Sequence, residues 1–94
     1  MSGAFVISTE VTSQDGSCGA YINAFVAVPS EPDARNLALR EMSQAGWIVR
    51  QITRVAWTTA EDYIDAPAAR EYFQQSLIDQ VVLVVHSFPA RTDH

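Results

Sequence analysis

The sequence has one cysteine and no lysine, and its longest uninterrupted apolar runs, such as Val81 to Val85, have only five residues. With Cys18 alone, an internal disulfide is excluded, and no group of cysteines and histidines has the spacing of a zinc site. The apolar runs are far shorter than the ~20 residues of a membrane-spanning helix, and the first residues lack the basic flank of a signal peptide. We therefore expect a cytoplasmic protein that needs no metal or other cofactor and does not associate with a membrane.

Positive charge is also scarce. Eleven acidic residues against six arginines give a formal net charge of −5. Surfaces that bind nucleic acids need clustered cations, so we expect no nucleic-acid partner. Disorder is excluded as well, because 48% of the residues are hydrophobic. The 94 residues predict a single domain over 1–94, with a frayed polar tail at 89–94.

Two antiparallel strands open the predicted fold. Apolar and polar residues alternate over residues 4–11, which is typical of a half-buried strand. Asp15 and Gly16 lie in a polar stretch and tolerate the positive φ angles of a hairpin turn. Residues 20–28 are apolar on both faces apart from Asn23, so this strand is expected in the interior of the sheet.

Two helices are predicted from their boundaries and apolar stripes. The first begins after Ser30, which forms a capping-box pattern with Asp33, and it ends at Gly46. The second starts at Pro67 and extends over residues 67–79, with an inward apolar stripe.

Two further strands complete the chain. Residues 47–58 form a long strand that places Arg50 and Arg54 on one solvated face near an edge of the sheet. Residues 59–62 have a second capping-box pattern and predict one helical turn. Residues 81–88 begin with a β-branched and leucine run, which predicts a central strand buried on both faces.

These elements predict an α+β fold with the order β-β-α-β-α-β. Because crossover connections are right-handed, we expect both helices on one face of a four-stranded mixed sheet, which makes a two-layer sandwich. The arrangement is ferredoxin-like in architecture, although a hairpin replaces the usual first connection. One face of the sheet would remain uncovered.

Few residues suggest catalysis. His86 is the only non-terminal histidine and therefore the candidate general acid or base, although strand-end histidines often only satisfy a nearby polar group. Cys18 lies in a glycine-flanked turn without a cationic neighbour that would activate its thiol. The acidic stretch Glu61, Asp62 and Asp65 matches no calcium loop. No convincing catalytic set results.

Ligand binding has more candidates. Tyr21 and Asn23 on the second strand, and Arg50 and Arg54 on the third, are the polar groups that could orient a ligand on the sheet. The two arginines would lie about 13 Å apart, too far to hold one phosphate together.

The uncovered sheet face predicts self-association. Strands with apolar residues on both faces and helices on only one would leave a large apolar patch in water, so we expect a homodimer through the sheet face. Two functions fit this picture. The first is a non-catalytic, self-associating binding or regulatory module for a small molecule or another protein. The second is a small enzyme subunit that uses His86 in a pocket between sheet and helices.

Overall fold

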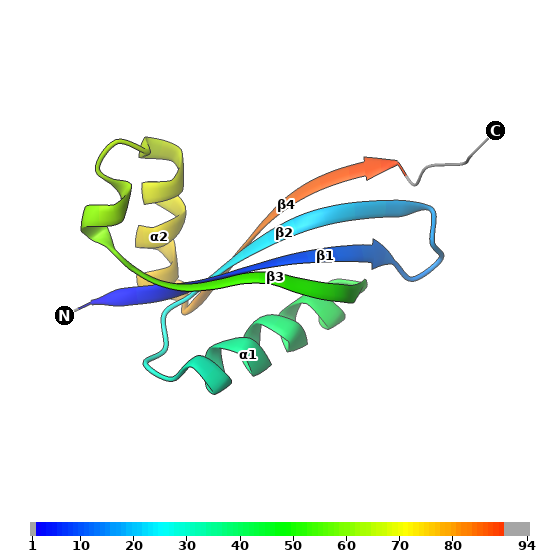
Figure 1. Cartoon of the computed structure of the whole chain (residues 1–94), viewed down its shortest axis with the longest axis horizontal. Coiled ribbons are helices and arrows are strands. Elements are labelled where there is room, and N and C mark those ends of the chain that lie inside the picture. Colours follow the sequence, from blue (N-terminus) through cyan, green and yellow to red (C-terminus); the bar gives the residue numbers. More distant parts are fainter. Residues whose placement is uncertain (1, 90–94) are drawn as a thin grey trace.

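The computed structural model describes residues 2–89 and has an α+β fold (Figure 1). Most of the predicted tail lies outside the described residues, while Pro89 belongs to the last strand. Along the chain, the elements are β1 (Gly3–Ser13), β2 (Cys18–Val26), α1 (Glu31–Gln44), β3 (Trp47–Thr59), the 3-10 helix η1 (Ala60–Tyr63), α2 (Pro67–Asp79) and β4 (Val81–Pro89).

The four strands form one open, fully antiparallel sheet in the spatial order β3-β1-β2-β4. The prediction of a mixed sheet is therefore wrong, and the predicted ferredoxin-like architecture is not confirmed. The interior position of β2 is confirmed, but β4 is an edge strand and not a central one. Its apolar first half is only half-buried, and its residues 85–88 are exposed.

The two helices lie on opposite faces of the sheet, which corrects the expectation that both cover one face (Figure 1). Strands β2 and β3 are both antiparallel to β1, so they run parallel and the handedness rule applies to α1 between them. Strands β3 and β4 run antiparallel to each other, because β4 is antiparallel to β2. The rule therefore places no constraint on α2, and this helix covers the other face.

Each helix has its own core cluster. Small and flexible residues of α1 (Ala34, Ala38 and Met42) lie against the buried side of β1 and β2, which includes Ile7 and Ile22. On the opposite face, Phe73 of α2 forms the second cluster with Ala4, Phe25 and Tyr63.

Two irregularities in β3 change which side chains face the helices. Ser8 pairs with Arg54 but Thr9 pairs with Ile52, and Glu10 pairs with Gln51 but Val11 with Val49. Thr53 and Arg50 are thus extra residues, as in β-bulges, and each shift moves the following side chains to the other face. Ile52 consequently packs against the α1 core. Arg54 keeps a partner in β1, Ser8, whereas Arg50 has none, so the regular alternation that predicted a shared face for the two arginines does not hold between them.

The predicted helix boundaries agree with the structure, but one predicted capping interaction is absent. Gly46 after α1 has a φ of 93°, and α2 covers the predicted residues. The side chains of Thr59 and Asp62 form a capping box at η1. Ser30 is the N-cap of α1, but it makes no side-chain capping bond, so the capping box predicted there is wrong.

The hairpin turn between β1 and β2 is built around Asp15. Its carboxylate accepts hydrogen bonds from the Ser13 hydroxyl (2.7 Å) and from the Ser17 amide (3.0 Å) and hydroxyl (2.7 Å). Gly16 follows with a φ of 75°. The hydrogen bonds from Ser17, then the one from Ser13, lower the pKa of Asp15 to about 2.

This turn gives a prediction for acidic solution. The folded-state pKa of Asp15 is depressed, so its contribution to stability is complete above the unfolded value of ~3.9 and is lost as the pH falls toward 2. An NMR titration of the Asp15 carboxyl should show a midpoint near 2, and Ser17→Ala should raise it by removing one donor. A wild-type midpoint near 4 would contradict the observed turn.

Candidate functional site

Helix α2 lies over one end of its face of the sheet (Figure 1), and in the remainder, among residues 2–89, side chains such as Arg54, Tyr21 and His86 are exposed. We call this remainder the open face. The strand register sets its side chains in rows across β3, β1, β2 and β4. The rows are Ala56, Val6, Phe25 and Val82 beside α2, then Arg54, Ser8, Asn23 and Val84, then Gln51, Glu10, Tyr21 and His86. A fourth row, Ile48, Thr12, Gly19 and Phe88, follows. Beyond the first row the open face is mixed: Arg54, Gln51, Glu10 and His86 are polar, whereas the large apolar side chains of Tyr21, Ile48 and Phe88 are exposed.

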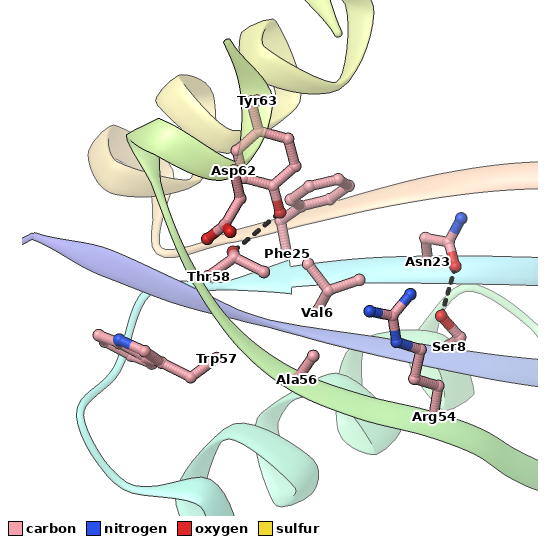
Figure 2. Close-up of a pocket in the computed structure, with 10 residues that line it drawn as sticks. All are labelled: Val6, Ser8, Asn23, Phe25, Arg54, Ala56, Trp57, Thr58, Asp62 and Tyr63. Atoms are coloured by element: carbon pink, nitrogen blue, oxygen red, sulfur yellow. Dashed lines mark hydrogen bonds between the residues drawn. The ribbon is translucent and has the colours of Figure 1, made fainter. Parts of the chain in front are cut away.

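A pocket of about 430 Å³ lies where the open face meets η1 (Figure 2). Its floor comes from the apolar side chains of the first row, and its wall comes from η1 and the end of β3. The lining residues are Val6, Ser8, Asn23, Phe25, Arg54, Ala56, Trp57, Thr58, Asp62 and Tyr63.

One end of the pocket carries hydrogen-bond donors. The Ser8 hydroxyl donates to the Asn23 carbonyl oxygen at 2.7 Å, which leaves the Asn23 amide hydrogens for a ligand. Figure 2 shows Arg54 extending from β3 toward this pair. Arg54 lines the pocket, and within residues 2–89 its guanidinium forms no salt bridge. Its donors are therefore available to an anion.

The other end of the pocket is a hydrogen-bonded wall. The Tyr63 hydroxyl donates to the Thr58 hydroxyl oxygen at 2.8 Å, and the Thr58 hydroxyl donates to the Ala4 carbonyl at 2.8 Å. Burial is the main cause that raises the pKa of Tyr63, so the phenol remains protonated at neutral pH. One Asp62 oxygen accepts from the Thr59 amide at 2.8 Å. This wall therefore adds a carboxylate opposite Arg54.

Local structure positions both ends. The Thr53 bulge directly precedes Arg54, and the Thr53 hydroxyl donates to the Ser8 carbonyl at 3.1 Å. Arg54 is thereby kept in the same row as Ser8 and Asn23. At the other end, the capping box at η1 holds Asp62, and the ring of Phe73 lies 5.0 Å from that of Tyr63.

The structure separates the residues proposed from the sequence. Asn23 and Arg54 line the pocket, whereas Tyr21 and His86 are paired in the next row of the open face. Arg50 is the extra residue of a bulge and does not line the pocket.

Cys18 is not in this site. Its thiol lies 3.3 Å from the Phe88 carbonyl oxygen, and the alternation along β2 and β4 places its side chain on the opposite face from His86. The two weak catalytic candidates, Cys18 and His86, therefore do not face each other. Within the described residues, no three histidine, cysteine, aspartate or glutamate side chains are grouped as in a metal site.

Sequence reasoning missed the pocket residues Ser8, Thr58, Asp62 and Tyr63. The capping-box pattern located η1 correctly, but it could not show that η1 folds back over the sheet. No family model, curated protein or solved structure matches the chain. Over residues 2–89, the structure has no helix with the length and apolar character to span a membrane.

Proposed function

We propose that this protein is a non-catalytic binding module that holds a small organic anion, with a carboxylate of the ligand paired to Arg54. The observation that carries the proposal is the Arg54 guanidinium, which has no salt-bridge partner within residues 2–89 and lines a pocket with an apolar floor. A guanidinium can bind a carboxylate through two parallel hydrogen bonds.

The surroundings of Arg54 favour a small ligand with one negative charge. A volume of about 430 Å³ is suited to a small molecule, and the Phe25 ring and Val6 supply an apolar floor for its body. The Asn23 amide adds a donor for the carboxylate. Asp62 in the same pocket disfavours a polyanion, because its carboxylate would repel additional negative charge.

The alternative function was an enzyme subunit with His86 as general acid or base. Such a residue needs to come within hydrogen-bond reach of the reacting atoms. His86 belongs to the next row of the open face and does not line the pocket. We therefore favour binding without catalysis.

The test uses benzoate and its neutral analogue benzamide as probes, with binding measured by titration calorimetry. Benzoate should bind the wild-type protein and benzamide more weakly, because only the carboxylate can form the charged pair with Arg54. Arg54→Gln should weaken benzoate binding by roughly 10- to 100-fold, the expected loss of a hydrogen-bonded charge pair.

Arg50→Gln is the matched control, since it removes the same charge from the same strand outside the pocket. It should leave benzoate binding unchanged. Equal loss in the two variants would show a general charge effect, and no loss in Arg54→Gln would contradict the proposed site.

A further inference from the structure

Within residues 2–89, β3 and β4 are the two edge strands of the sheet, and they differ in how they are protected. Edge strands in natural proteins commonly carry bulges or charged residues that prevent pairing with another chain. Strand β3 has both, because Arg50 and Thr53 are extra residues in its register with β1. Strand β4 has neither, since its register with β2 is continuous and Val81–Phe88 contains no aspartate, glutamate, lysine or arginine.

One hydrogen bond shows which backbone groups of β4 point toward β2 and which point outward from the sheet edge. The Ala27 amide donates to the Gln80 carbonyl at 2.8 Å, so these two residues are a hydrogen-bonded pair of the antiparallel ladder. Such pairs alternate along the ladder, so the amides and carbonyls of every second residue point away from β2. These residues are Val81, Leu83, Val85 and Ser87.

We propose that the β4 edge pairs antiparallel with β4 of a second copy of this chain, about a two-fold axis at Val84. In this register Leu83 of one copy lies opposite Val85 of the other, and Val81 lies opposite Ser87. Every outward-facing backbone group named above then gains a partner. The two-fold arrangement is the commonest form of self-association.

The composition of β4 favours a second copy over another partner. A chain with net charge −5 repels itself through most surfaces, but the β4 edge brings together two uncharged strands. The same lack of charge gives a charged partner nothing to recognise. Val85 is 42% exposed in the monomer, and the proposed pairing places it beside an apolar Leu83. The proposed self-association thus uses the β4 edge, where unpaired backbone groups are available, and not the open face that was expected from the sequence.

Two kinds of variant test this dimer by sedimentation equilibrium. The wild-type protein should be a dimer at tens of micromolar. Val85→Lys puts a charge at the exposed edge and should weaken the dimer by more than about tenfold. The control Gln51→Lys places the same charge on β3 and should leave the dimer intact. Circular dichroism verifies that both variants are folded.

A cross-link tests the register independently of any loss of folding. Val84 lies opposite its own copy in a non-hydrogen-bonded pair, where the ~4.5 Å Cα separation suits a disulfide. In a Cys18→Ser background, Val84→Cys should form an intermolecular disulfide under mild oxidation, and Gln51→Cys should not. A monomeric wild-type protein, a dimer unaffected by Val85→Lys, or a failure of the Val84→Cys cross-link would each overturn the proposal. So would a dimer that dissociates only with Tyr21→Ser on the open face.

Discussion

Replacing Ile7 by alanine should lower the free energy of unfolding by ~2–5 kcal/mol, the usual cost of removing a fully buried branched side chain. Ile7 lies on the central strand β1 and is 0% exposed under helix α1. The cavity left behind is enclosed by sheet and helix, so the surroundings cannot easily collapse into it. Urea denaturation followed by circular dichroism measures the change.

The loss of unfolding free energy in Leu83→Ala should be compared with that in Ile7→Ala. Leu83 is at the centre of the most apolar run in the sequence, but it lies half-buried on the edge strand β4. Its removal should cost only ~1–2 kcal/mol, because part of the side chain already contacts water. A loss at Leu83 as large as that at Ile7 would indicate that β4 is a central strand after all.

Phe73→Ala should have an effect of similar size, ~3–5 kcal/mol, because Phe73 is the main attachment of α2 to the sheet. The Phe73 side chain is 1% exposed and belongs to the cluster with Ala4, Phe25 and Tyr63. Thermal and urea unfolding of this variant should both shift to milder conditions.

The neighbouring Tyr72 is the matched control for Phe73. It is 40% exposed and contacts the cluster only at its border, with its ring 6.0 Å from that of Phe25. Tyr72→Ala should therefore cost no more than ~1 kcal/mol. Equal effects of the two variants would mean that α2 is not attached through Phe73.

The Phe73 variant also connects stability with the proposed site. The Phe73 ring supports Tyr63, and Tyr63 forms the pocket wall with Thr58. Loss of Phe73 should thus weaken benzoate binding under conditions where the protein remains folded, even though Phe73 does not line the pocket. The second core cluster therefore serves both the attachment of α2 and the shape of the pocket.

Several elements were determined by the sequence alone, because their signals act over a few neighbouring residues. The hairpin at Asp15 and Gly16, the end of α1 at Gly46 and the start of α2 at Pro67 each depend on local backbone angles or caps. The alternation in β1 similarly identifies a half-buried strand whatever its neighbours are.

The arrangement of these elements was decided only by the tertiary structure. The apolar run of β4 is compatible with a central or an edge strand, and only its pairing with β2 places it at the edge. The handedness rule covers α1 but not α2, since α2 connects antiparallel strands. The wrong predictions for the position of β4 and for the face covered by α2 follow from these two facts.

The pocket depended on the tertiary structure most of all. Asn23 and Arg54 could be proposed from the sequence, but Arg50 appeared equivalent to Arg54 on an unbroken strand. A bulge shifts the alternation of the side chains that follow it, β3 has two of them, and nothing in residues 47–58 indicates where they fall. The register with β1 determines that Arg54, and not Arg50, lies beside Ser8, because strand pairing is set by contacts between residues far apart in the chain.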